Sequence, residues 1–248
     1  MEAFAVTGAP DIFASVAHVA GIGLRAAFKV KWWDALKIRP EVLAQRVDMI
    51  DRGEYEGMGF PDLGELKLNM EYGRETLEAV SSKNELLNGE AGIDSKLLLL
   101  QFPEGSPVHP SWVAGHAVVA GACTTVLKAM FRTHDVNGGR LKWGSELKHS
   151  VNGDDLVDYE GEDGVECTII GEMNKLASNV SIGRDMAGVH FRCDGDCGMA
   201  LGEKVAIKYL VDKCKEYYEG DVGIFGGYML EKFDGELIKI TSDGVTVM

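Results

Sequence analysis

The chain has the spacing of amphipathic helices over most of its length. Between residues 11 and 33, side chains recur at intervals of three and four, which predicts a helix with one apolar face. The residues near that face are Phe13, Ala17, Ala20, Leu24, Phe28 and Lys31. Arg39-Pro40 then opens a second predicted helix, PEVLAQRVDMI, because proline is well suited to the first turn of a helix.

Four further stretches are predicted as helices. They are a polar amphipathic segment at 74–88, an Ala- and Gly-rich segment at 115–131, a segment from Ile169 to Arg184, and a segment at 198–218. The segment that begins at Ile169 carries an apolar face on which Arg184 is the next position. That face consists of Ile169, Met173, Leu176, Ala177 and Val180.

The remaining segments are predicted as loops and strands. Gly and Pro punctuate residues 51–63, which indicates a loop, and the seven carboxylates at 154–166 indicate a solvated acidic loop. Near the C-terminus, Asp234-Gly235 and Asp243-Gly244 separate alternating apolar runs, which predicts a small β-meander within 225–248. The expected fold class is therefore mainly α, a helical bundle with a short C-terminal β-meander.

Composition narrows the classes of function. A chain of 248 residues that is 46% hydrophobic can bury a sizeable core, and we expect one domain over 1–248. The formal net charge of −14 argues against nucleic-acid binding, which needs a basic surface. The five cysteines include one close pair, CDGDC, and no second pair completes a zinc site.

The N-terminal sequence shows no targeting or membrane signal. It has no basic region typical of a signal peptide, and no uninterrupted apolar run reaches the roughly 18 residues that a membrane span needs. We therefore expect a soluble protein with no membrane partner, and the sequence leaves its compartment open.

Two cations occupy apolar helix faces in this acidic chain. Lys31 lies on the face of the first predicted helix, and Arg184 lies on the face of the helix that begins at Ile169. Burying an unpaired cation costs several kcal/mol or more, so each needs an anionic partner. Together with Arg39 near a helix start, they predict a pocket that holds an oxyanion.

Gly115-His116 and His190 fit the same pocket. A helix N-terminus offers free backbone N–H groups to an anion, and glycine allows a close approach. His116 and His190 could each serve as proton donor, proton acceptor or metal ligand, since imidazole titrates near neutrality. Asp194, four residues after His190, could fix the tautomer of that ring through a hydrogen bond. The residues alone predict an oxyanion-binding helical pocket with two histidines.

Three motifs give the chain a specific resemblance. Lys31 and Arg39-Pro40 are separated by seven residues, HPS…GH spans 109–116, and Arg184, His190 and Asp194 follow at fixed intervals. This pattern resembles the vanadium-dependent haloperoxidases, in the superfamily that also includes acid phosphatases. EGSP at 104–107, GEMNKLASNV at 171–180 and GRDMAGVHFR at 183–192 extend the resemblance toward the bromoperoxidase branch, as does the seven-residue gap.

The resemblance implies a fold and a role for each motif residue. It implies an all-α haloperoxidase/acid phosphatase-like core that binds vanadate, with the chain corresponding to the catalytic C-terminal half and lacking the N-terminal half. His190 is then the axial vanadium ligand, Lys31, Arg39 and Arg184 neutralise the vanadate oxygens, and Gly115 donates its backbone N–H. His116 is the acid–base residue for hydrogen peroxide, Lys31 polarises the peroxide, and His109 tunes halide oxidation.

The resemblance also implies the reaction and its participants. Hydrogen peroxide oxidises a halide, with bromide expected first, to hypohalous acid, which halogenates a small organic acceptor; the family also suggests a homo-oligomer. Two alternatives stay open at this point. A phosphatase could use the same pocket with His190 as nucleophile and His116 as acid. The chain could also be an oxyanion binder without turnover.

One residue departs from the family pattern. Ala114 precedes Gly115-His116, where the family usually has a serine whose hydroxyl bonds an oxygen of vanadate. A hydrogen bond to a charged group contributes roughly 1.5–3 kcal/mol, so its loss weakens anion binding by roughly ten- to a hundredfold. We expect the three cations and the axial imidazole to supply the larger share of binding.

Overall fold

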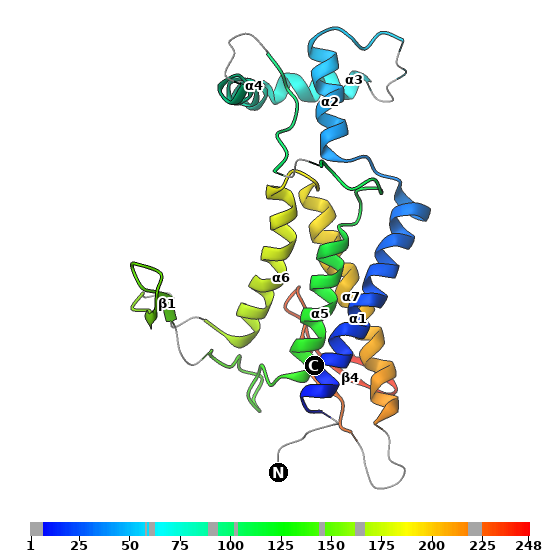
Figure 1. Cartoon of the computed structure of the whole chain (residues 1–248). Coiled ribbons are helices and arrows are strands. Elements are labelled where there is room, and N and C mark those ends of the chain that lie inside the picture. The colour runs from blue at the N-terminus through cyan, green and yellow to red at the C-terminus, as the bar shows by residue number, and fades with distance from the viewer. Residues whose placement is uncertain are drawn as a thin grey trace. The chain divides into compact units, whose positions relative to one another are not determined.

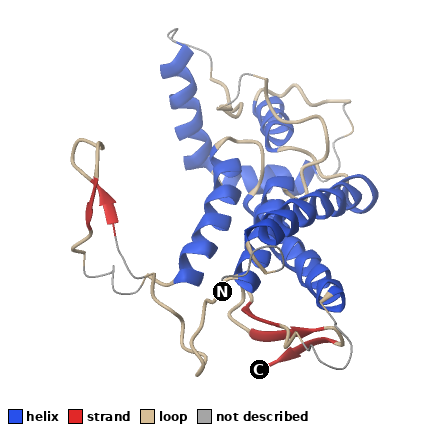
Figure 2. Ribbon diagram, turned by 60° about the horizontal axis from the view of Figure 1, so that its bottom comes forward, coloured by secondary structure: helices blue, strands red, loops and turns tan. Residues whose placement is uncertain are grey.

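The computed structural model describes residues 7–57, 59, 63–88, 94–101, 104–143, 147–161, 167–217 and 225–248. It is mainly helical, with strands confined, among these residues, to a short hairpin and a C-terminal meander (Figure 2). The chain divides into two compact units. Unit 1 is Met1–Lys29, Val113–Ser181 and Gly195–Met248, and unit 2 is Val30–Trp112 and Ile182–Asp194.

Unit 1 is built on helix-to-helix packing. It holds α1 (Ala9–Lys29), α5 (Gly115–Met130), α6 (Ile169–Met186) up to Ser181, and α7 (Arg192–Glu216) from Gly195 onward (Figure 1). Helices α5 and α7 approach closely at Gly202, where an added Cβ would lie 2.2 Å from the carbonyl oxygen of Val118. A side chain at this position would therefore force the two helices apart.

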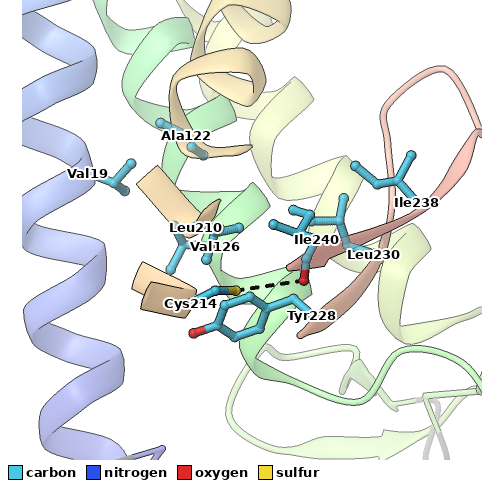
Figure 3. Close-up of a cluster of buried hydrophobic side chains, with 10 residues drawn as sticks. Val19, Ala122, Val126, Leu210, Cys214, Tyr228, Leu230, Ile238 and Ile240 are labelled. Atoms are coloured by element: carbon cyan, nitrogen blue, oxygen red, sulfur yellow. Dashed lines mark hydrogen bonds between the residues drawn. The ribbon is translucent and has the colours of Figure 1, made fainter. Parts of the chain in front are cut away.

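The β-meander closes the core of unit 1. Strands β3 (Tyr228–Glu231), β4 (Leu237–Thr241) and β5 (Gly244–Val247) pair antiparallel in that order, with Tyr228 opposite Ile240 and Leu230 opposite Ile238. Their buried side chains join those of α1, α5 and α7 (Figure 3). The cluster consists of Val19, Ala122, Val126, Ala206, Leu210, Cys214, Tyr228, Leu230, Ile238 and Ile240.

Unit 2 surrounds the motif residues with short helices and an extended segment. It contains η1 (Val30–Ala35), a π-helix, followed by α2 (Pro40–Asp51), α3 (Leu63–Tyr72) and α4 (Arg74–Asn88). The extended segment after α4 is held by hydrogen bonds to two side chains, Asp48 and Asn84. The buried Asp48 accepts the N–H of Lys96 at 2.7 Å, and Asn84 donates to the carbonyl oxygens of Ser95 and Leu97 at 2.7 and 3.0 Å.

Most predicted elements are confirmed. The mainly α class with its C-terminal meander is correct, and the turns at Asp234-Gly235 and Asp243-Gly244 lie where the sequence placed them. Proline occupies the first turn of α2, as expected. The sequence missed α3 and the exposed hairpin of β1 (Leu147–His149) and β2 (Leu156–Asp158), which lies partly in the predicted acidic loop. Residues 162–166 of that loop lie outside the described residues.

The predicted apolar face of the first helix is wrong. Phe13 is 74% exposed and Leu24 is 43% exposed, whereas the buried residues of α1 are Ser15, Val19, Gly23 and Ala27. Small residues are buried because α1 lies against α5. A Cβ added at Gly23 would lie 3.5 Å from side-chain atoms of both Ala122 and Val118. Lys31 follows Ala27 by one turn and continues this small-residue face rather than the predicted one.

The face predicted for the helix that begins at Ile169 is also only partly buried. Leu176 is 57% exposed and Val180 is 38% exposed, while Ile170, Ala177 and Ser181 are buried. Arg184 follows Ser181 at helical spacing, so it still continues the buried face of α6.

One stretch of the chain is long and apolar enough to cross a membrane, contrary to the expectation from the sequence. Ala9–Asp51 contains an 18-residue window that is apolar enough to cross a membrane by length and composition. The expectation that no segment reaches this length is therefore wrong by that measure. Packed core helices and signal sequences meet the same measure, so it is weak evidence for a membrane span. The absence of a membrane partner stays a prediction.

Candidate functional site

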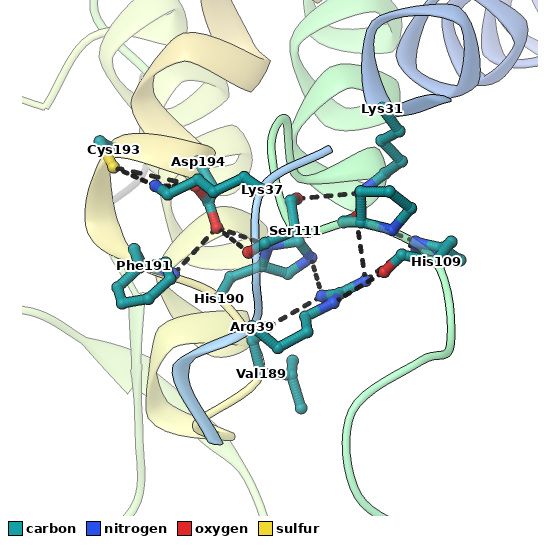
Figure 4. A network of polar contacts seen from close by, with 11 residues as sticks. Lys31, Lys37, Arg39, His109, Ser111, Val189, His190, Phe191, Cys193 and Asp194 are labelled. Atoms are coloured by element: carbon teal, nitrogen blue, oxygen red, sulfur yellow. Dashed lines mark hydrogen bonds and ion pairs between the residues drawn. The ribbon is translucent and has the colours of Figure 1, made fainter. Parts of the chain in front are cut away.

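Lys31 is buried inside unit 2 by the π-helix η1. The wider turn of this helix is closed by the N–H of Leu36, which donates to the carbonyl oxygen of Lys31 at 3.1 Å. The Lys31 side chain is fully buried, and its Nζ donates to the carbonyl oxygens of Pro110 and Ser111 at 2.6 and 2.9 Å (Figure 4). Burial, and then the charge of Arg39, lower its pKa to about 8. The predicted inward cation is present.

Arg39 lies at the centre of the polar network. Its backbone is extended, as expected for a residue before proline, and the residue is 5% exposed. Nε donates to the carbonyl oxygen of His109 at 3.0 Å, and Nη1 donates to that of Val189 at 2.8 Å. Nη1 also lies 3.0 Å from His190 Nε2. Burial lowers the pKa of Arg39 to about 10, which leaves it charged at neutral pH.

His190 and Asp194 form the predicted pair. Both side chains are buried, and His190 Nδ1 lies 3.1 Å from Asp194 Oδ2. Burial alone would raise the pKa of Asp194, but hydrogen bonds from His190, Lys37 and Ser111 outweigh it and hold this pKa below its usual range. An ionised carboxylate only accepts, so His190 Nδ1 carries the hydrogen. The second ring nitrogen, Nε2, then presents its lone pair, which accepts from Arg39 Nη1 in this structure.

The imidazole of His190 is neutral at physiological pH. Burial lowers its pKa to about 4; the hydrogen bond to Asp194 opposes this shift, and the charges of Arg39 and Lys31 add to it. A neutral imidazole with a fixed tautomer is the form that coordinates metals.

Arg184 joins the cations of unit 2. It lies half-buried near the end of α6, and burial lowers its pKa. Its charge lowers the pKa values of Lys31, Arg39 and His109. Arg184 also lines a hollow of about 330 Å³ with residues 104–108 and Val189. The predicted convergence of three cations is therefore seen in unit 2.

His109 contacts the same network from the HPS motif. Its Nδ1 lies 2.9 Å from Arg39 Nη2, and the ring is half-buried. Burial lowers the pKa of His109, and the charges of the three cations lower it further. The structure thus brings six predicted residues together: Lys31, Arg39, His109, Arg184, His190 and Asp194.

Gly115 and His116 belong to unit 1. They begin α5, and His116 is exposed. Ala114 is the N-cap of this helix and makes no side-chain capping hydrogen bond. The place of Gly115 and His116 beside the unit 2 residues stays a prediction.

Two residues of the network were missed by the sequence reading. Lys37 Nζ forms an ion pair with Asp194 Oδ1 at 2.8 Å, and the fully buried Ser111 donates its hydroxyl to Asp194 Oδ2. Ser111 could have been predicted, because it is the serine of the HPS motif. Lys37 gave none, because 157 positions separate it from Asp194.

The donor set fits an oxyanion better than a bare cation. Within the described part of the chain, no three His, Cys, Asp or Glu side chains gather as a metal site. Unit 2 instead offers three buried or half-buried cations and one imidazole nitrogen. Vanadate is an anion whose oxygens accept hydrogen bonds and whose metal accepts one ligand, so these residues fit it.

Comparisons with known proteins indicate the family to which the chain belongs. The family model described as the VCPO second helical-bundle domain matches residues 94–220. A vanadium-dependent bromoperoxidase from Corallina officinalis is 34% identical over 243 residues, which are 96% of this chain and 38% of that protein. One from Ascophyllum nodosum is 32% identical over 230 residues, which are 91% of this chain and 37% of that protein.

A solved structure has a similar fold. The homohexameric structure of the second vanadate-dependent bromoperoxidase (AnII) from Ascophyllum nodosum matches with a TM-score of 0.77 and 28% identity. The match covers 100% of this chain and 43% of that one, so the chain spans less than half the length of these relatives. With the family model and the relatives in agreement, the chain belongs to the vanadium-dependent haloperoxidase family and carries its second helical-bundle domain.

Proposed function

We propose that this protein is a vanadate-dependent haloperoxidase that uses hydrogen peroxide to oxidise bromide. The observation that carries the proposal is the local excess of cations around Lys31 and His190 in unit 2. Lys31 donates to backbone carbonyl oxygens, and Arg39 contacts carbonyl oxygens and imidazole nitrogens. The pKa of each is lowered, first by burial. Asp194, the carboxylate bonded to His190, is already paired with Lys37. An oxyanion supplies the missing negative charge.

Each residue of the network has a role in this proposal. His190 offers Nε2 as the vanadium ligand, because Asp194 holds the hydrogen on Nδ1. Lys31, Arg39 and Arg184 neutralise the oxygens of vanadate, and Gly115 donates its backbone N–H. Bound vanadate would act as a Lewis acid on hydrogen peroxide. His116 takes the proton from the peroxide, Lys31 polarises it, and His109 tunes the oxidation of the halide.

The proposed partners are hydrogen peroxide, a halide and a small organic acceptor. We also propose a homo-oligomer. The AnII structure is described as homohexameric. In this chain, Phe13 of α1 is 74% exposed and Trp33 of η1 is 84% exposed. Light scattering coupled to size-exclusion chromatography checks the assembly, and a monomer at micromolar concentration would contradict it.

Bromination of a chromogenic acceptor tests the activity. Purified protein is assayed with hydrogen peroxide and bromide, with and without vanadate, beside His190→Ala. Activity is expected to require vanadate and bromide, and to fall by about a thousandfold in His190→Ala, since the residue that would bind the vanadium is lost. His149→Ala is the matched control, because His149 is an exposed histidine of β1. Its activity should equal that of the unaltered protein.

The same preparations separate this function from the phosphatase alternative. Hydrolysis of a phosphate monoester with accumulation of phosphohistidine at His190, and no bromide oxidation, would replace the proposal. Vanadate binding without turnover in folded protein would reduce it to oxyanion binding.

A further inference from the structure

We propose that Lys37 is a positioning residue, which acts through Asp194 to hold His190 ready for an oxyanion. The proposal deepens the proposed function and rests on it. Lys37 lies in the linker between η1 and α2, and its side chain is 34% exposed. Its Nζ lies 2.8 Å from Asp194 Oδ1, 3.1 Å from Cys193 Sγ and 4.4 Å from the centre of the Phe191 ring (Figure 4). None of the three family motifs includes it.

The two oxygens of Asp194 have separate partners. Oδ2 accepts from His190 Nδ1 and from the N–H of Phe191, both at 3.1 Å, and from the hydroxyl of Ser111. Oδ1 accepts from Lys37. A carboxylate rotates about its last side-chain bond over a broad, two-fold range unless both oxygens are held. Lys37 therefore prevents the rotation that would withdraw Oδ2 from His190.

The backbone directs Lys37 into this position. Leu36, the preceding residue, has a φ of 46°, a left-handed conformation that a branched side chain adopts only when its surroundings impose it. The N–H of Leu36 is held by Lys31, and the carbonyl oxygen of Lys37 accepts the N–H of Ser111 at 2.8 Å. Ser111 in turn donates to Asp194, which closes a ring of contacts between Lys37, Ser111 and Asp194. The left-handed turn at Leu36 and the ion pair between Lys37 and Asp194 are therefore linked through these hydrogen bonds.

Lys37 also balances charge. The carboxylate of Asp194 is fully buried, one hydrogen bond away from the imidazole that would bind vanadium. Without a counter-charge it would repel an approaching oxyanion. The ammonium group of Lys37 meets Asp194 on the side away from His190, so it offsets the repulsion without occupying the ring nitrogen. Positioning and charge balance both predict weaker oxyanion binding when Lys37 is replaced.

The test compares Lys37→Met and Lys37→Arg with a control variant at another paired lysine. Lys232→Met is the control, because the Lys232 side chain is 24% exposed and pairs with two carboxylates in unit 1. Vanadate affinity is measured by calorimetry. The tautomer of His190 is read from ¹⁵N chemical shifts in histidine-labelled protein, with the signal assigned by His190→Ala.

Lys37→Met is expected to weaken vanadate binding about tenfold and to mix the Nδ1–H and Nε2–H tautomers of His190. Lys37→Arg should restore both properties, and Lys232→Met should change neither. Unchanged affinity with a single Nδ1–H tautomer in folded Lys37→Met would overturn the proposal. If that variant does not fold, Lys37→Gln, which keeps a hydrogen-bond donor and loses the charge, is measured in the same way.

The two readouts separate this proposal from the proposed function. A tautomer change in Lys37→Met supports positioning by Lys37, even if the unaltered protein shows no bromide oxidation. Full activity in the unaltered protein, together with an unperturbed His190 in the variant, leaves the function standing and removes Lys37 from it. A lower melting temperature with an unchanged tautomer assigns Lys37 a purely structural role.

Discussion

Two lysines of this protein share their burial and differ in their surroundings. Lys31 of unit 2 and Lys128 of unit 1 are each fully buried, and the pKa of each is lowered to about 8, mainly by burial. Each donates to a backbone carbonyl oxygen: Lys31 to those of Pro110 and Ser111, and Lys128 to that of Glu231 at 3.2 Å. The charges nearby decide what each can do.

Around Lys128 the charges are balanced by the protein itself. The carboxylates of Glu203, Glu231 and Asp234 favour its charged form, and its Nζ lies 3.8 Å from the centre of the Phe233 ring. Glu231 also accepts two hydrogen bonds from Arg140, at 2.9 and 2.7 Å, and contacts His134 at 3.2 Å. We define Lys128, His134, Arg140, Glu203 and Glu231 as the ionic cluster. It joins α5 to the β-meander.

Around Lys31 the neighbouring charges are mostly positive. Arg39 and Arg184 disfavour its charged form, and Asp194, which favours it, already pairs with Lys37. A buried cation without its own counter-ion is unfavourable in a purely structural setting. The comparison indicates that the ionic cluster stabilises the fold, and the different surroundings of Lys31 support the proposal that the cations near it hold an oxyanion.

The largest expected effect is on the stability of unit 1. Glu231→Gln keeps the shape of the side chain and removes the charge that Arg140, His134 and Lys128 share. Breaking a buried ion pair leaves uncompensated charge, so we expect a loss of about 3 kcal/mol in the free energy of unfolding. Urea unfolding measures it, and vanadate affinity should not change. The exposed Glu236→Gln, which loses only a pairing with Lys232, should lose less than about 1 kcal/mol.

The pH dependence of stability tests the same cluster. Lys128 has a folded pKa of about 8 against an ordinary value of 10.5. Between these values the unfolded chain holds a proton that the folded chain has released, so stability rises as pH increases through this window. The rise is at most about 3 kcal/mol, and Lys128→Met should remove it.

Urea unfolding at pH 7.5 and pH 10 measures this difference. Because Lys31 has a similar pKa, the comparison is made in the Lys31→Met background. Equal slopes with and without Lys128 would show that this lysine keeps its ordinary pKa in the folded protein.

The sequence anticipated the chemistry of the site better than the packing around it. Six motif residues meet in unit 2. Lys31 and Arg184 were expected to point inward because a cation on an apolar helix face needs an anionic partner, whereas His109 was expected only from the family resemblance. The buried face of α1 was misjudged because large apolar residues were assigned to the core. The close approach of α1 to α5 instead selected small ones, such as Gly23 and Ala27.

Lys37 shows why part of the site was out of reach of the sequence. Its partner Asp194 is distant in the chain, and its orientation depends on a left-handed residue, Leu36, that no residue preference would predict. Helix α3 was missed for a related reason, since its sequence LGELKLNMEY has weak amphipathic periodicity.

Lys31→Met tests the opposite side of the comparison. The variant loses a cation that would bond the oxyanion, so vanadate affinity should fall about 30-fold, or about 2 kcal/mol. Without vanadate its stability should stay the same or rise, because an apolar side chain replaces a buried charge that has no counter-ion of its own. Calorimetry and thermal unfolding measure the two quantities. Lys128→Met should leave the affinity intact; equal losses of affinity in both variants would erase the distinction between the two regions.

The smallest effect concerns Ala114, where the family has serine. Ala114→Ser is expected to tighten vanadate binding about tenfold by adding a hydrogen-bond donor to the oxyanion. Ala114 is also the N-cap of α5 and has extended backbone angles, so serine would cap the helix and add about 1 kcal/mol of stability. Ala114→Gly separates the two roles, because glycine is a favourable N-cap residue without a hydroxyl. A higher melting temperature in Ala114→Ser than in Ala114→Gly, with tighter binding in neither, would assign the hydroxyl to the helix alone. Tighter binding in Ala114→Ser only would place the start of α5 at the oxyanion site with the cations of unit 2.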